Sequence, residues 1–101
     1  MTDYLIELSL TEVCHAVQLP EHDFMEMVEY GIVVPLGDDP ADWSFTMQMV
    51  GIARQACRLH RDLDLEWSAV ALVVDLLEQR DKLQHENQML KSRLDRFLAD
   101  Q

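Results

Sequence analysis

The sequence predicts a mainly α-helical protein, with a winged helix-turn-helix at residues 1–65 and a long helical dimerisation region at residues 66–101. Three observations support this architecture. Two short helical segments are joined by a tight turn within the first 31 residues, and a turn-rich segment with short apolar runs on either side follows them. No Gly or Pro then interrupts residues 73–101. With 49% apolar and 27% charged residues, the chain can bury a core.

The first 31 residues contain the signals that begin and end a strand and two helices. Apolar side chains alternate at residues 4–8, which suits a short strand. Ser9 and Glu12 form a capping box, and Pro20 opens a second helix that Gly31 ends in the left-handed conformation. The expected core faces are Leu10, Val13, Cys14 and Val17 on the first helix, and Phe24, Met27 and Val28 on the second.

Residues 32–66 predict a small wing and a third helix. "IVVP" (32–35) and "WSF" (43–45) flank the turn-rich "LGDDPAD", so two short strands are expected there. Thr46 caps a helix that "DLDLEW" ends, and Asp64 or Glu66 starts the next one. The expected core residues of these two helices are Val50, Ile52, Ala53, Ala56, Cys57 and Leu59, followed by Trp67, Val70, Ala71 and Val74.

The C-terminal helix carries a seven-residue repeat, which predicts a homodimer. Leucines and one phenylalanine occupy every seventh position, and Asn87 is a lone asparagine in the companion row. The alternative is a single amphipathic helix folded back on its own domain. Glu86 and Lys91 would suit a parallel pair, but the direction stays open. The expected seam comprises Val73, Leu76, Leu83, Asn87, Leu90, Leu94 and Phe97, with Arg80 in the companion row.

The net charge of −11 is concentrated in the first half of the chain. Residues 1–53 hold ten acidic residues and no Lys or Arg, whereas the remainder holds nine acidic and eight basic residues. Nucleic-acid affinity depends largely on cations that displace counterions, so direct DNA or RNA binding is not expected. The acidic half is either a solvated surface that favours solubility or a face for a basic protein partner.

Two sets of surface residues are candidates for partner binding. The outward face of the second helix is expected to show Glu21, His22, Met25, Glu26 and Glu29. Arginines at i, i+4 and i+7 form the second set, Arg54, Arg58 and Arg61, on one face of the third helix. Any one of these charges could equally be a solvated rim residue that adds little to binding.

Other functional classes lack support in the sequence. Cys14, His15, Cys57 and His60 have the wrong spacing for a zinc finger, and two distant thiols are typical of buried cysteines in a reducing compartment. No glycine-rich phosphate loop or nucleophile motif occurs, so no enzyme, cofactor or metal site is expected. Without a signal peptide or an apolar run of roughly 18 residues, the expected location is the cytoplasm, with no membrane contact.

Several segments together resemble one known group of proteins. The run from residue 10 to residue 35, "WSF", the third helix and "LDLEWSAV" resemble the MerR-like winged helix-turn-helix followed by a dimerising helix. Within that group the chain is similar to the chaperone-modulator CbpM family. "LTEVC", "EYGIVVP", "ACRLHRDLDLEW" and "LQHENQMLKSRLDRFLA" carry this likeness, which covers nearly the whole chain.

The resemblance implies a cytosolic inhibitor that binds the J-domain of a DnaJ-like co-chaperone, the curved-DNA-binding protein CbpA. Capture of that domain would prevent it from stimulating the DnaK-type chaperone and would curb DNA binding by CbpA. J-domains use a basic helix to reach their chaperone, and an acidic competitor matches such a surface. The alternative is a MerR-type DNA-binding transcription regulator. Such regulators place Arg and Tyr along the second helix, where this chain has His22, Asp23, Met25, Glu26 and Met27.

Overall fold

The computed structural model describes residues 6–100, and its first part contains two short helices joined by a tight turn, α1 (Leu10–Val17) and α2 (Glu21–Glu29). The predicted capping box is confirmed, because Ser9 Oγ accepts from the amide of Glu12 at 3.2 Å and the Glu12 carboxylate accepts from the amide of Ser9 at 2.9 Å. Gln18, with φ 55°, ends α1. Gly31 follows α2 with φ 77°, as predicted, so both helix ends are set by local sequence.

The predicted wing is only partly present, and its first strand was predicted wrongly. "IVVP" forms no strand, because Ile32 and Val33 are buried in the core and the amide of Ile32 donates to the Met27 carbonyl at the end of α2. The wing is reduced to one bridge between Leu36 and Ser44 around a 3-10 turn at Pro40–Asp42.

The strand from "WSF" pairs with the chain's beginning instead of with "IVVP". β2 (Phe45–Thr46) runs antiparallel to β1 (Glu7–Leu8), with Leu8 opposite Phe45. Ser44 Oγ also donates to a Glu7 carboxylate oxygen at 2.7 Å. β1 covers the end of the lead-in strand predicted at residues 4–8, and Tyr4 lies outside the described residues. The small sheet therefore ties the start of the chain to the start of the third helix.

The third and fourth helices are long and meet at a short turn. α3 (Met47–Asp62) begins with Thr46, whose Oγ1 accepts from the Met49 amide at 3.2 Å. Asp64 adopts φ 52° in the turn. α4 (Trp67–Ala99) follows with Glu66 as its N-cap residue, and no Glu66 side-chain hydrogen bond closes the cap. Of the two predicted starts of α4, the structure selects Glu66.

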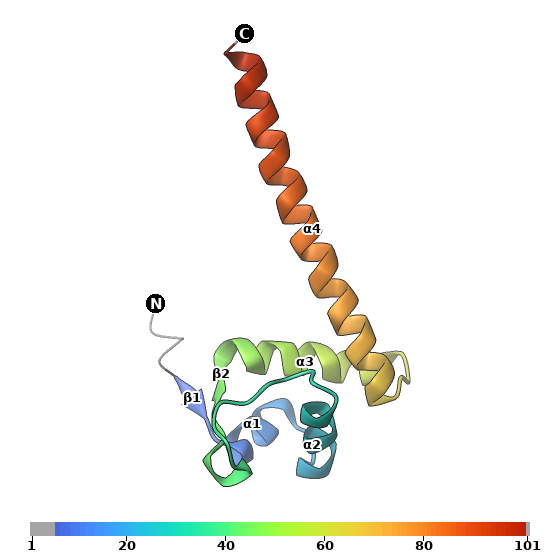
Figure 1. The fold of residues 1–101 in the computed structure, drawn as a ribbon. Helices are drawn as coiled ribbons and strands as arrows, with labels where there is room; N and C mark the ends of the chain where they lie inside the picture. The colour runs from blue at the N-terminus through green and yellow to red at the C-terminus, as the bar shows by residue number, and fades with distance from the viewer. Residues whose placement is uncertain (1–5, 101) are drawn as a thin grey trace.

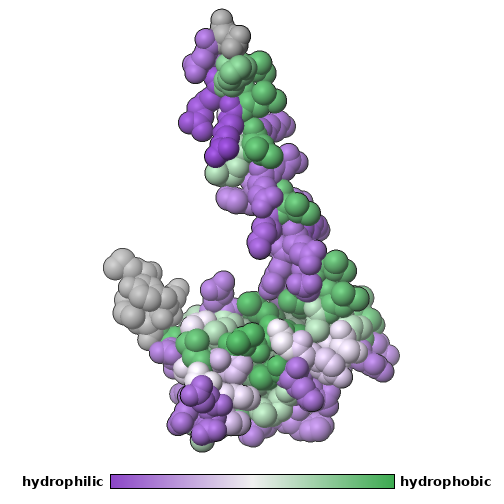
Figure 2. All heavy atoms as spheres, in the orientation of Figure 1, coloured by the Kyte–Doolittle hydropathy of each residue, from purple (hydrophilic) through white to green (hydrophobic). Residues whose placement is uncertain are grey.

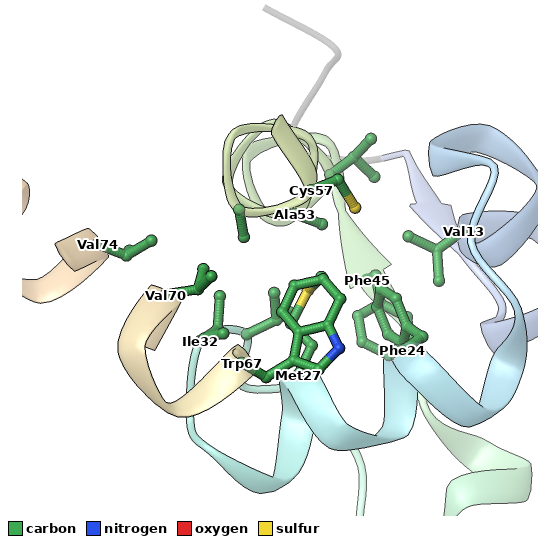
Figure 3. Packing of buried hydrophobic residues seen from close by; sticks show 13 residues of the cluster. Val13, Phe24, Met27, Ile32, Phe45, Ala53, Cys57, Trp67, Val70 and Val74 are labelled. Carbon is green, nitrogen blue, oxygen red and sulfur yellow. The ribbon is translucent and has the colours of Figure 1, made fainter. Parts of the chain in front are cut away.

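The core lies where the four helices meet, and its members come from every helix. Figure 3 shows labelled side chains from α1, α2, α3 and α4 pointing toward one another around Met27 and Trp67. Phe24 and Phe45 form an edge-to-face pair with ring centres 5.2 Å apart. The core consists of Val13, Phe24, Met27, Ile32, Val33, Phe45, Val50, Ala53, Ala56, Cys57, Trp67, Val70 and Val74.

Helix α4 leaves this group of elements and projects away from it, as Figure 1 shows. Only its first turns pack into the core, and every residue from 78 to 100 is exposed. The molecule is therefore elongated, with principal extents of 59, 34 and 21 Å. Within residues 6–100, no helix has both the length and the apolar character that crossing a bilayer requires.

Candidate functional site

The outward face of α2 lies at the surface, as the helical spacing predicts. Glu21, His22 and Glu29 are exposed, whereas Met25 and Glu26 are half-buried. His22 Nε2 lies 3.4 Å from a Glu26 carboxylate oxygen one turn later. Since α2 contains no Lys or Arg, the face carries negative charge with a methionine between the acids. Such a face suits a cationic protein surface better than a phosphate backbone.

The three arginines of α3 share one face and line a pocket of about 270 Å³ beside the end of α1. Arg54, Arg58 and Arg61 are all exposed. Arg61 Nε lies 3.6 Å from a carboxylate oxygen of the neighbouring Asp62, and both side chains are exposed. Arg54 and Arg58 form no ion pair with any other residue in the described part of the chain. The arginine face therefore keeps most of its charge available.

Charges from α2 and from the arginine face of α3 both influence the buried Cys57 thiol. Burial raises the pKa of the Cys57 thiol, Arg61 lowers it, and Asp23 raises it again. Both charges therefore act on the same buried sulfur. Burial and the charge of Glu21 likewise raise the pKa of Cys14. The thiols of α1 and α3 are thus each influenced by an acidic residue of α2.

A third surface feature brings together residues that the sequence did not single out as a group. A pocket of about 320 Å³ is formed where α2, the end of α3 and the start of α4 meet, and we call it the acidic–aromatic pocket. Its lining residues are Asp23, Glu26, Tyr30, His60, Glu66, Trp67 and Ser68. They lie in three segments up to 45 positions apart in the sequence, so no local motif could have revealed them.

One set of side chains in the described residues 6–100 has its potential metal ligands close together. Ligand atoms of His22, Asp23 and Glu26 lie within 4.8 Å of one another. All three come from one helix, and acidic groups at a protein surface commonly lie together without an ion. We therefore assign no metal to them. Cys14, His15, Cys57 and His60 are not brought together as such a group.

The predicted seam residues form an exposed apolar ridge along α4. The leucines at positions 76, 83, 90 and 94 and Phe97 are 53–64% exposed, and Val73 is half-buried near the base of the helix. Figure 2 shows hydrophobic residues along one edge of the projecting helix and hydrophilic residues along the other. An apolar ridge of this length is rarely left in water, so it is suited to cover by another helix.

Comparisons with known proteins place the chain among regulators. Residues 8–92 match the model of the family described as MerR HTH family regulatory protein. The chain is 41% identical over 93 residues to the chaperone modulatory protein CbpM of Pseudomonas putida strain W619, covering 92% of both chains. It is 33% identical over 99 residues to the protein of the same name in Salmonella paratyphi B, covering 98% of both. These names describe modulatory and regulatory proteins.

Proposed function

The chain belongs to the CbpM family of chaperone modulatory proteins, within the MerR-like helix-turn-helix group, and we propose that it inhibits a DnaJ-like co-chaperone of the CbpA type. It binds the J-domain of that co-chaperone in the cytoplasm. While bound, it prevents the J-domain from stimulating the DnaK-type chaperone, and it curbs DNA binding by the co-chaperone. Two observations support the proposal. The chain belongs to this family, and its first 53 residues, which include the helix-turn-helix, contain no Lys or Arg.

The α2 face is the proposed primary contact with the J-domain. Its acids oppose the basic helix of a J-domain, and complementary charge of this kind speeds encounter and fixes orientation. Half-buried Met25 supplies an adaptable apolar contact between the charges. The contact residues proposed are Glu21, His22, Met25, Glu26 and Glu29, with Arg54, Arg58 and Arg61 as a secondary contact beside them.

Calorimetry with a purified J-domain of the CbpA type tests this function directly. We expect saturable heat and co-elution at micromolar concentrations, with an association rate that falls as salt is raised. Glu26→Lys should weaken binding by about tenfold or more, since a like charge then meets the basic helix. Asp38→Lys in the wing turn makes the same charge change away from the face and serves as the control. No heat and no co-elution for the unmodified chain would remove the proposal.

Assembly through the α4 ridge is the second element of the proposal. Two copies pack their ridges together, and the pair presents two J-domain-binding faces. The exposure of the ridge supports this arrangement, because a lone helix would leave these leucines and Phe97 in water. Light scattering of the unmodified chain should return the mass of two copies.

A DNA-binding regulator of the MerR type is the competing function. The matching family model is described as a MerR HTH family regulatory protein, and the arginine face of α3 offers a cationic surface that DNA binding would need. The absence of Lys and Arg from α2 argues against the usual mode, in which the second helix of the motif enters the major groove. A salt-dependent mobility shift of duplex DNA by the isolated protein would favour this function over co-chaperone inhibition.

A further inference from the structure

We infer that the acidic–aromatic pocket binds an arginine side chain of the protein partner. This inference rests on the proposed function, because it takes the partner to be the J-domain. The pocket opens beside the α2 face and has room, at about 320 Å³, for one long side chain. The pocket would bind one anchor residue of the partner. The open α2 face would contribute long-range electrostatic attraction.

Charge is the first argument for a cationic occupant. Three carboxylates from α2 and the start of α4 line the pocket, those of Asp23, Glu26 and Glu66. The ion pair of Glu26 within the described range 6–100 is with exposed His22, and neither Asp23 nor Glu66 forms one there. No Lys or Arg of the chain lines the pocket. The carboxylates thus lack a cation from their own chain, which a partner's side chain can supply.

The second argument is the indole N–H of Trp67, a lining residue, which no group in the described part of the chain engages. Trp67 is only 4% exposed, and its indole N–H has no hydrogen-bond partner within the described part of the chain. No side-chain N or O atom there is both fully enclosed and unpartnered, so this N–H keeps some contact with solvent. Trp67 is one of the residues that line the acidic–aromatic pocket. A backbone carbonyl that accompanies the bound arginine would accept from it.

The floor of the pocket is held in a fixed arrangement. The rings of His60 and Trp67 stack with centres 4.1 Å apart and planes within 10°. His60 Nδ1 lies 2.6 Å from the carbonyl oxygen of Leu65, so Nδ1 carries a proton and donates to that oxygen. The indole position is thus set from both sides, by this stack and by the core. Such preorganisation lowers the entropic cost of binding.

The shape of the lining favours arginine over other ligands. Tyr30 is 51% exposed at the rim and offers an aromatic face on which a planar guanidinium can stack. A guanidinium can also bond two carboxylate oxygens at once, which an ammonium cannot do with the same geometry. A phosphate or a nucleic acid would meet three carboxylates and be repelled.

A fluorescence titration tests the pocket without any protein partner. In a Trp43→Phe background, Trp67 is the remaining tryptophan and reports on the pocket directly. We expect Nα-acetylarginine amide to change its emission saturably in the millimolar range, as suits a single small contact. Nα-acetylcitrulline amide has the same shape without the charge and should leave the emission unchanged. An equal response to both compounds, or no response to either, would overturn the inference.

Binding to the J-domain then tests the pocket in its proposed setting. Glu66→Gln should weaken J-domain binding about tenfold, because a contact with a charged partner is lost. Glu66 makes no side-chain cap bond to α4, so this variant should fold normally, which circular dichroism checks. Asp42→Asn in the wing turn removes the same charge elsewhere and should have no effect.

The two proposals fail in different ways. Binding by Glu66→Gln and by Tyr30→Ala as tight as that of Asp42→Asn would overturn the pocket while leaving co-chaperone inhibition intact. Absence of J-domain binding by the unmodified chain would remove the proposed function, and the arginine titration would still decide whether the pocket takes a guanidinium.

Discussion

The two ends of helix α4 differ more than any other two regions of the molecule. Its first turns place Trp67, Val70 and Val74 in the core, each with 5% exposure or less. Beyond residue 77, the same helix has no buried residue at all. The helical head, residues 6–77, can thus be stabilised by its own packing. The distal segment, residues 78–100, is helical without a core of its own, and in the proposed dimer the second copy would cover its apolar ridge.

The largest expected effect comes from breaking the head. Phe24→Ala removes a fully buried ring that packs edge-to-face on Phe45. Urea denaturation should show the free energy of unfolding reduced by about 3–5 kcal/mol, the usual cost of such a cavity. Leu63→Ala, at a 59% exposed site in the α3–α4 turn, should change it by only about 0.5 kcal/mol. Similar losses in both variants would contradict the placement of the core.

A charge in the distal segment should break assembly and leave the head intact. Leu83→Asp puts a carboxylate into the apolar ridge, where pairing would desolvate it. Light scattering should then give the mass of one chain. Gln88→Asp changes the charge on the outward side of the same helix and should leave the pair together. If Leu83→Asp keeps the mass of the unmodified chain, the ridge is not the seam.

A change of one polar residue should sharpen the role of the ridge. Asn87→Leu removes the lone amide from the seam, so the assembly should withstand greater dilution. The same change should loosen the register or the number of chains, because a buried polar residue often specifies both. Sedimentation velocity across a dilution series measures the two effects together. A single dimeric species that dissociates at an unchanged concentration would show that Asn87 lies outside the seam.

The smallest effect concerns the two thiols of the head. Since burial raises the pKa of both Cys14 and Cys57, alkylation by iodoacetamide at pH 8 should be slower than for a free thiol. Cys57, at 9% exposure, should react more slowly than half-buried Cys14. Cys14→Ser and Cys57→Ser assign the two rates by mass spectrometry. Equal, rapid labelling of both thiols would contradict the packing around Cys57.

The raised pKa also fixes the sign of a stability change with pH. In the unfolded chain the thiols ionise near their ordinary pKa of about 8.5, below the pKa of the folded state. The unfolded state therefore binds fewer protons above that pH. Stability from these thiols is fully present at neutral pH and falls as the pH rises toward the folded-state pKa.

The parts of the fold that sequence could predict are those set by neighbouring residues. Ser9, Thr46 and Gly31 specify helix ends through one side chain or one backbone angle, and all three predictions are confirmed. The arginine face of α3 follows from helical spacing alone. The wing depended on a choice between partners that are distant in sequence. Ile32 and Val33 pack among the helices instead of pairing in a strand. The strand propensity of these residues does not show how much burial the helices offer them, so it could not predict this outcome.

The same distinction applies to the candidate sites. The α2 face lies on one helix, so its members could be predicted from periodicity. The acidic–aromatic pocket needs Asp23, His60 and Glu66 to meet, and that meeting depends on the left-handed turn at Asp64 and the stacking of His60 on Trp67. Neither feature has a signature in a single sequence. Only the packed structure could reveal the pocket.

Helix α4 is continuous, and its first residues, Trp67 and Ser68, line the acidic–aromatic pocket. A small change in the angle of the helix at this end, the pivot, therefore produces a larger displacement at the other end. A straight helix of 33 residues is about 50 Å long, so a tilt of about 5° at the pivot displaces the far end by about 4 Å. A shift of that size is comparable to the spacing between successive side-chain layers of a helix pair. In the proposed dimer, rotation of either head would misalign the two α4 helices, so their pairing would limit how far a head can rotate on binding a partner.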